Sequence, residues 1–301
     1  MTRRLPAAQL PPWLEAMLPA GIERYRIDVG GRLMAFMEIG QGRPVVMVHG
    51  NPTWGFLYRR VAQALAGDDM RLIMPDLLGL GLSDRIEIDE HTVSNHVRWL
   101  RLGLDALELD RMVVVVQDWG GPIGVLAACD ARAHLDAMVV MNTGFGPPKK
   151  DLKPTLFHRI SHLPVVSEIL FRGLGFPQIG LGMAQGDRSS IRGKVSRAYR
   201  YPLRDRRTNN APLALARMVP NHPDHPSIPQ LRRSQEELES FAGPVALVWG
   251  TRDPILGRLI HRLKRQRPDA RVTETEAGHF LQEEVPGEIA EAIRWAVAES
   301  A

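Results

Sequence analysis

The sequence contains a single cysteine, Cys129, and no apolar run of the roughly 20 residues that a membrane-spanning helix needs. One cysteine excludes an intrachain disulfide framework and favours a reducing, cytoplasmic location. The N-terminal segment "MTRRLPAAQLPPWLEAMLPAG" is interrupted by prolines and lacks the apolar core of a signal peptide. We therefore predict a protein without a membrane partner.

The chain also lacks a strong excess of one charge. Its net charge is +4, and its arginines are spread along the sequence without interleaved aromatic residues, which argues against a nucleic-acid partner. Residues 144–230 alone carry 14 Lys and Arg against 5 Asp and Glu. Either this is a solvated basic surface, or its field acts on an anion at a nearby site. No set of ligand-type residues has metal-binding spacing, so we expect neither a metal nor another cofactor.

Short apolar runs rich in Val and Ile alternate with helix-like patterns along most of the chain. Continuous runs such as "MVVVVQ" and "VALVWG" are typical of parallel strands that helices cover on both faces. Gly30 and Gly31 separate the first two runs and predict an antiparallel hairpin. The predicted strands are Arg24–Val29, Leu33–Ile39, Val45–His49, Leu72–Met74, Met112–Val116, Met138–Met141, Val245–Trp249 and Arg271–Thr275, and the predicted helices are Tyr58–Leu65, Val93–Leu107, Pro122–Asp130 and Glu288–Ala298.

The alternation fails between residues 144 and 230, where helix-like apolar spacing continues without a strong strand. We predict that residues 144–230 form a helical cap, and that residues 1–143 and 231–301 form the core. Insertions at the carboxyl ends of parallel strands lie over the crevice in which such sheets bind ligands.

The motif "VVVVQDWGGPIG" carries the strongest chemical signal. A strand ends just before Asp118 and a helix-like run follows, which is the layout of a nucleophile elbow. Gly120 is expected to leave room for a neighbouring strand or helix, whereas Val116 departs from the usual glycine. A carboxylate is already ionised at neutral pH, so it can attack a saturated carbon and form an ester that water then cleaves. The alternative is that Asp118 only caps the helix.

Two further residues follow predicted strands and complete a candidate catalytic set. Asp253 follows the run "PVALVWG", and His279 lies in "ETEAGHFLQEEVP" after the last strand. The chain order Asp118, Asp253, His279 matches the nucleophile–acid–histidine order of α/β-hydrolases. We therefore predict an α/β-hydrolase fold, with a mostly parallel eight-stranded sheet flanked by helices and a helical cap.

The motif "VHGNPTW" places Asn51 directly after a strand, where enzymes of this fold carry a second oxyanion donor. The backbone N–H groups of Asn51 and Trp119 are the predicted donors to the oxyanion that forms during ester cleavage. Asp253 would fix the imidazole of His279 in the tautomer that accepts a proton from water.

The motifs "HGNPTW", "QDWGGPI" and "AGHFLQEE" resemble those of the haloalkane dehalogenases over most of the chain, least so in the cap. The resemblance implies that Asp118 attacks the carbon that carries the halogen. It also implies that Trp119 and Asn51 donate hydrogen bonds to the leaving halide. The substrate would be a small apolar halogenated compound, the products an alcohol and a halide ion, and no cofactor would be needed.

Other functions stay open at this point. The same motifs resemble β-lactone decarboxylases of olefin biosynthesis, and the fold also serves as a non-catalytic ligand-binding protein. An epoxide hydrolase would need cap tyrosines that protonate the epoxide oxygen together. This function is disfavoured because Tyr199 and Tyr201 are two residues apart and turn to different helix faces. Trp119 stands where a fluoroacetate dehalogenase would have arginine. The apolar segment "PPWLEAML" is a candidate contact for a homo-oligomer.

Overall fold

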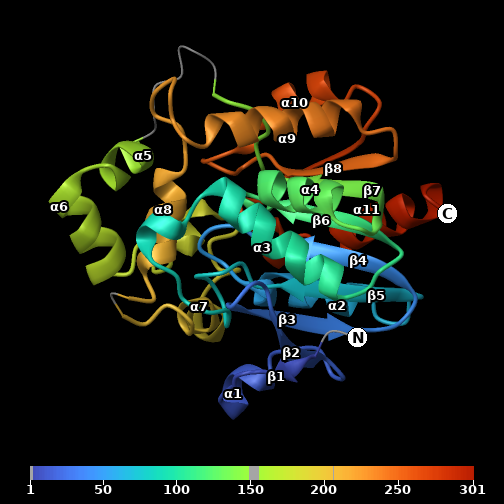
Figure 1. Cartoon of the computed structure of the whole chain (residues 1–301), viewed down its shortest axis with the longest axis horizontal. Coiled ribbons are helices and arrows are strands. Elements are labelled where there is room, and N and C mark those ends of the chain that lie inside the picture. Colours follow the sequence, from blue (N-terminus) through green and yellow to red (C-terminus); the bar gives the residue numbers. More distant parts are fainter. Residues whose placement is uncertain (1–2, 149–155, 206) are drawn as a thin grey trace.

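The computed structural model describes residues 3–148, 156–205 and 207–301, and these contain one nine-stranded sheet (Figure 1). The order β1-β2-β3-β5-β4-β6-β7-β8-β9 is antiparallel from β1 to β5 and parallel from β5 onward, so the predicted mostly parallel sheet is confirmed. The ninth strand is the two-residue β1, which pairs at the edge. The strands are β1 Leu5–Pro6, β2 Glu23–Asp28, β3 Leu33–Ile39, β4 Arg43–Val48, β5 Met70–Pro75, β6 Arg111–Gln117, β7 His134–Met141, β8 Val245–Gly250 and β9 Arg271–Thr275.

Helices cover both faces of this sheet. Helices α3, α4 and α9 pack together on one face, and α2 and α11 pack together on the other. In Figure 1, α3 and α4 lie in front of the central strands. The core helices are α1 Pro12–Glu15, α2 Arg59–Ala64, α3 Val93–Ala106, α4 Gly120–Asp130, α9 Ile228–Ser240, α10 Ile260–Gln266 and α11 Pro286–Glu299, with short 3-10 turns at Gly55–Tyr58, Ile88–Glu90, Gly257–Leu259 and Leu281–Glu283.

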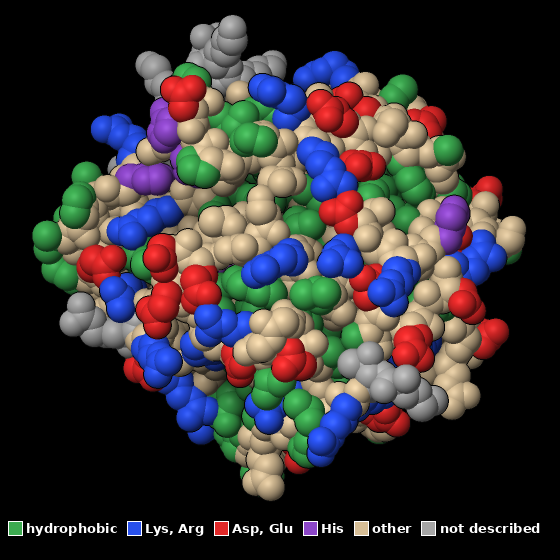
Figure 2. All heavy atoms as spheres, in the orientation of Figure 1, with side chains coloured by type: hydrophobic (Ala, Val, Ile, Leu, Met, Phe, Trp, Pro, Cys, Tyr) green, Lys and Arg blue, Asp and Glu red, His purple; other side chains and the backbone are tan. Residues whose placement is uncertain are grey.

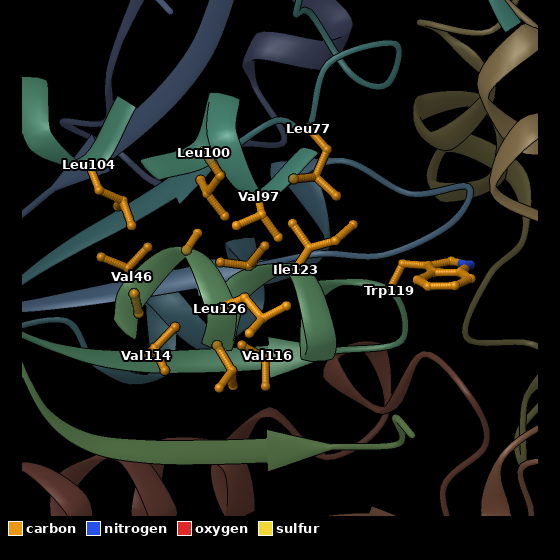
Figure 3. Close-up of a cluster of buried hydrophobic side chains, with 14 of the residues drawn as sticks. Val46, Leu77, Val97, Leu100, Leu104, Val114, Val116, Trp119, Ile123 and Leu126 are labelled. Atoms are coloured by element: carbon orange, nitrogen blue, oxygen red, sulfur yellow. The ribbon is translucent and has the colours of Figure 1, made fainter. Parts of the chain in front are cut away.

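Strand β6 shows why the central apolar runs are continuous. Val114 and Val116 pack in the core cluster on the α3 and α4 face, and Val113 and Val115 pack in the cluster on the α2 and α11 face. Successive side chains of a strand point to opposite faces, so a strand buried on both sides needs apolar residues at every position. Figure 3 shows Val114 and Val116 beneath the aliphatic side chains of α3 and α4.

The predicted hairpin joins β2 and β3. Gly30 and Gly31 have φ of 87° and 82°, in the region that glycine adopts without steric cost. Their N–H groups donate to Asp28 Oδ1 at 2.9 and 2.7 Å. The strands on either side pair antiparallel, as predicted.

Between β7 and β8 the described part of residues 144–230 contains helical segments and no strand. In Figure 1 these segments lie beyond the carboxyl ends of the central strands. Helix α9 begins at Ile228 and packs on α4, so a core helix starts three residues before the predicted start of the second core segment at residue 231. The division into core and cap remains our proposal. The cap segments are α5 Leu156–Ser161, α6 Pro164–Ser167, the π-helix η3 Glu168–Gly173, η4 Leu181–Ala184, α7 Gly193–Arg200 and α8 Asn210–Arg217.

The surface mixes charges of both signs on the face shown in Figure 2. Within the N-terminal apolar segment that we considered as an oligomer contact, Leu14 and Leu18 are buried against the core. Large exposed apolar side chains occur on the cap, among them Val165 and Leu174. Within the described residues, no helix combines the length and the apolar character needed to cross a bilayer.

Candidate active site

The three predicted catalytic residues meet at the carboxyl edge of the sheet. Asp118 follows β6, Asp253 follows β8 and His279 follows β9, so each side chain comes from a loop directly after a parallel strand. His279 Nδ1 lies 2.8 Å from Asp253 Oδ2, and His279 Nε2 lies 3.6 Å from Asp118 Oδ2. The imidazole therefore stands between the two carboxylates.

Asp118 occupies a tight turn in the left-handed region, with φ of 51°. Three backbone contacts hold this turn: Asp118 N–H donates to Asn142 O at 3.1 Å, while Asp118 O accepts from Gly121 N–H at 2.9 Å and from the Thr143 hydroxyl at 2.6 Å. Non-glycine residues adopt this conformation only where surrounding contacts enforce it. The elbow predicted from the sequence is present.

Two glycines allow the elbow to pack. A Cβ at Gly120 would lie 2.3 Å from the carbonyl oxygen of Val48, so α4 could not approach β4 with a side chain there. A Cβ at Gly124 would lie 2.8 Å from a methyl group of Val116. Val116 stands where the usual elbow motif has a glycine, and Gly124, one turn into the helix, leaves space for its side chain.

The two oxygens of the Asp118 carboxylate have different neighbours. Oδ1 accepts the backbone N–H of Asn51 at 2.7 Å, whereas Oδ2 faces His279. Gly50 is required beside it, since a Cβ there would lie 2.3 Å from Oδ1. Oδ1 is held by a backbone donor, and Oδ2 is the oxygen that can attack. The backbone N–H of Asn51, one of the two predicted oxyanion donors, thus contacts the Asp118 carboxylate.

Asp253 is buried, and several donors stabilise its charge. Burial raises the pKa of Asp253, but His279 and hydrogen bonds outweigh this effect and lower it. The bonds come from Asn142 Nδ2 to Oδ2 at 2.7 Å and from the Ile255 N–H to Oδ1 at 2.7 Å. Asn142 also exchanges hydrogen bonds with the backbone of Gly250, at 2.9 and 2.7 Å. Asn142 therefore holds the Asp253 carboxylate in place.

The charge state of His279 follows from its two neighbours. Burial alone lowers the pKa of His279, but the Asp253 and Asp118 carboxylates outweigh burial and raise the pKa to about 10. The backbone N–H of His279 donates to Ala184 O at 2.8 Å, which ties this loop to the cap segment η4. The two carboxylates on either side therefore favour the protonated form of the imidazole.

Gln117 is a site residue that the sequence did not identify as such. Its amide nitrogen lies 3.1 Å from the carbonyl oxygen of His279 and 3.3 Å from His279 Nε2. The second contact is a hydrogen bond only when Nε2 carries no proton. A fully buried glutamine at the end of an apolar strand was the available signal.

The two predicted halide donors line the same cavity as Asp118. Trp119 is 9% exposed, and Figure 3 shows its indole beyond the end of the aliphatic cluster. Within the described residues no hydrogen bond to the indole N–H is found. One amide hydrogen of Asn51 donates to Pro212 O of α8 at 3.0 Å, which leaves the other for a ligand. An indole N–H donates without an acceptor lone pair, as binding of an anion requires.

The cavity above these residues has a volume of about 570 Å³. This is within the usual range of small-molecule sites, and its walls are mainly apolar. Its described lining includes Asn51, Asp118, Trp119 and His279 from the catalytic edge, Phe145, Phe176, Leu181, Met183, Ala216 and Val219 from the chain between β7 and β8, and Ile255, Leu256, Leu259 and Phe280 from the core. No group of three or more His, Cys, Asp or Glu side chains suited to a metal occurs among the described residues.

Known proteins resemble this chain in both sequence and structure. A family profile described as alpha/beta hydrolase fold matches residues 43–161. The chain is 32% identical over 259 residues to a haloalkane dehalogenase of Mycobacterium marinum, with 84% of each chain covered. It is 34% identical to haloalkane dehalogenase 2 of Mycobacterium bovis, covering 86% of this chain and 89% of that one.

Solved structures agree on the fold. The tetrameric haloalkane dehalogenase DpaA of Paraglaciecola agarilytica superposes with a TM-score of 0.79 at 25% identity and 98% coverage of both chains. The haloalkane dehalogenase DatA of Agrobacterium tumefaciens gives a TM-score of 0.80 at 24% identity, covering 94% of this chain and 99% of that one. At this identity the latter match shows the α/β-hydrolase fold alone.

Proposed function

The chain belongs to the haloalkane dehalogenase family, and we propose that Asp118, His279 and Asp253 carry out its reaction. The protein is a hydrolase that acts on carbon–halide bonds by hydrolytic dehalogenation. One observation carries the assignment of residues: Asp118 Oδ2 and His279 Nε2 lie 3.6 Å apart beside an apolar cavity. The similarity favours this activity over a β-lactone decarboxylase and over a non-catalytic ligand-binding protein.

In the first proposed step, Asp118 Oδ2 attacks the carbon that bears the halogen. The new O–C bond forms as the carbon–halogen bond breaks, and the electron pair leaves with the halide. Asn51 N–H keeps Oδ1 in place at 2.7 Å, so Oδ2 is the oxygen that reacts. The product of this step is an alkyl ester of Asp118 and a halide ion.

Trp119 and Asn51 are the proposed halide donors. A hydrogen bond to a charged group contributes about 1.5–3 kcal/mol. Because charge develops on the halogen only as the bond breaks, these donors bind the transition state more strongly than the neutral substrate. The bond from Asn51 to Pro212 O orients the amide and links this donor to the cap.

In the second proposed step, His279 takes a proton from water, and the hydroxide formed attacks the ester carbonyl carbon. Asn51 N–H, already bonded to Oδ1, stabilises the resulting oxyanion. The intermediate then collapses as the C–O bond to the alkoxide breaks, and the alkoxide takes the proton from His279. Loss of the remaining hydroxyl proton to solvent restores the Asp118 carboxylate. Asp253 stabilises the imidazolium throughout at 2.8 Å. The net reaction converts one haloalkane and one water into an alcohol, a halide and a proton.

The test measures bromide release from 1-bromobutane and 1,2-dibromoethane beside CO2 release from a dialkyl β-lactone. We expect bromide release that depends on Asp118 and no CO2. Asp118→Asn should abolish bromide release, and Asp28→Asn, a change in the β2–β3 hairpin, should leave it intact. Bromide release by Asp118→Asn at the normal rate would contradict the assigned nucleophile, and CO2 release alone would contradict the reaction.

A further inference from the structure

The catalytic cavity has a second, basic end. Besides the apolar wall, its lining includes Arg258, His261, Arg262 and Arg265. These residues belong to the 3-10 turn that leads into α10 and to α10 itself, which follow the triad acid Asp253 in the chain. The lining therefore combines the buried catalytic edge with cationic side chains, of which Arg258 and Arg265 are exposed.

Helical spacing puts these side chains on one face. Positions 258, 261, 262 and 265 are separated by three and four residues, so their side chains form a single stripe. A helix rises about 1.5 Å per residue, and the stripe thus extends over about 10 Å from Arg258 to Arg265. The cationic side chains of Arg258, Arg262 and Arg265 therefore share one wall of the cavity.

Other cationic side chains of α10 and of the residue that follows it form ion pairs. Lys264, on another side of α10, pairs with Glu274 of β9, and Arg267 pairs with Asp269 at 2.6 Å. By contrast, the exposed side chains of Arg258 and Arg265 form no ion pair with any described residue. Cationic groups that line a cavity and lack an acidic partner are available to a ligand.

Arg262 forms the inner part of this basic end. It donates to Pro147 O at 3.0 Å and to Gln235 Oε1 at 2.8 Å, which fixes its guanidinium at the wall. Glu239 of α9 also faces this region, but Gln235 Nε2 donates to its carboxylate at 2.8 Å. One acid beside three arginines leaves this end of the cavity positive.

Resting on the proposed function, we infer that this protein acts on halogenated compounds whose far end carries an anionic group such as a carboxylate. The halogen would lie at Trp119 and Asn51, the apolar chain along the cavity wall, and the carboxylate against Arg258 and Arg265. Arginine forks match the two oxygens of a carboxylate.

This inference predicts how activity depends on the chain length of the substrate. A short substrate would place its carboxylate beside the anion of Asp118, where like charges repel. A longer substrate would carry its carboxylate past the apolar wall to the arginines. We therefore expect bromoacetate to be a poor substrate, and the preference for an acid over the matched alcohol to increase with length.

The experiment compares kcat/KM for 6-bromohexanoate and 8-bromooctanoate with that for 6-bromohexan-1-ol and 8-bromooctan-1-ol. The ratio of kcat/KM for the acid to kcat/KM for the matched alcohol should exceed one. Adding a halide-free salt should lower this ratio, since exposed charges are screened over about 10 Å at 0.1 M. In Arg258→Gln/Arg265→Gln the ratio should fall by roughly fivefold per arginine, the upper range for an exposed ion pair. Arg132→Gln, an exposed arginine before β7 at the opposite edge of the sheet, is the matched control.

The outcomes separate the two proposals. Bromide release from the alcohols with an acid-to-alcohol ratio below one, or a ratio that the double substitution leaves unchanged, would overturn this inference but not the dehalogenase function. An equal loss of kcat/KM for acids and alcohols would show that the arginines do not recognise the carboxylate, and would also overturn this inference. If no brominated compound released bromide, the proposed function itself would fail.

Discussion

Replacing His279 with phenylalanine should stop the proposed reaction halfway. The side chain is 1% exposed and packs edge-on against Phe280, so a ring of similar size can fill its place. Alkylation of Asp118 does not require a base, because the carboxylate is already ionised. Hydrolysis of the ester requires one. We expect one halide per site in a burst, followed by slow turnover.

The effects of His279→Phe on rate and on stability follow from the two roles of the imidazole. A positioned general base contributes about 10²–10⁴ in rate, and this factor should be lost from ester hydrolysis only. The substitution also removes the 2.8 Å bond to Asp253, leaving a buried carboxylate that keeps the bonds from Asn142 and Ile255. Breaking a buried pair typically costs about 3–5 kcal/mol, so the variant should unfold at lower denaturant concentration.

Quenched-flow measurement of bromide and mass spectrometry of the quenched protein test this expectation together. The burst amplitude should equal the number of sites, and a peptide that contains Asp118 should gain the mass of the alkyl group. His134→Phe, an exposed histidine at the other edge of the sheet, is the control and should turn over normally. Steady turnover by His279→Phe at the parent rate, without a burst, would refute the assigned base.

Three more predictions concern the same site. Trp119→Phe should slow the burst about 10–150-fold, the value of one hydrogen bond to a developing anion; an unchanged burst would exclude the indole as a halide donor. Asp118→Asn should lower the pKa of His279 below about 10, because an anion beside the imidazolium is lost; NMR titration of the ring measures this, and an unchanged value would contradict the pairing. The folded pKa of His279 exceeds its ordinary 6.5, so its contribution to the free energy of unfolding is full below pH 6.5 and is lost as the pH rises to about 10. Denaturant unfolding of the parent protein and His279→Phe should therefore converge over that window, and a constant difference would oppose this account.

Much of the fold was predictable because burial on both faces leaves a continuous apolar run. The runs at Leu33–Ile39 and Arg271–Thr275 became strands with the predicted bounds, while β7 extends four residues before its predicted start. His134 and Asp136 lie at the amino end of that strand, where Asp136 pairs with Arg43 and Arg111, so the apolar periodicity is interrupted there. The two-residue β1 has no pattern of its own and exists only by pairing with β2.

The site was predictable where chemistry and chain position coincide, and less so where contacts come from distant segments. Asp118, Asp253 and His279 each follow a strand, so topology alone brings them to one edge. The bond from Asn51 to Pro212 depends on how a helix between β7 and β8 lies over the core, and no local motif encodes it. The arginines of α10 resemble an ordinary solvated helix face until the structure places them on the cavity wall.

The charges around His279 account for the order of the proposed steps. Before alkylation, Asp118 and Asp253 together hold the imidazole as a cation, which cannot take a proton from water. Esterification removes the charge of Asp118, so one of the two groups that raise the pKa of His279 is lost and the ring can release its proton to solvent. The Gln117 amide nitrogen, 3.3 Å from Nε2, then favours the unprotonated ring by donating to it. The base therefore becomes effective only after the ester has formed.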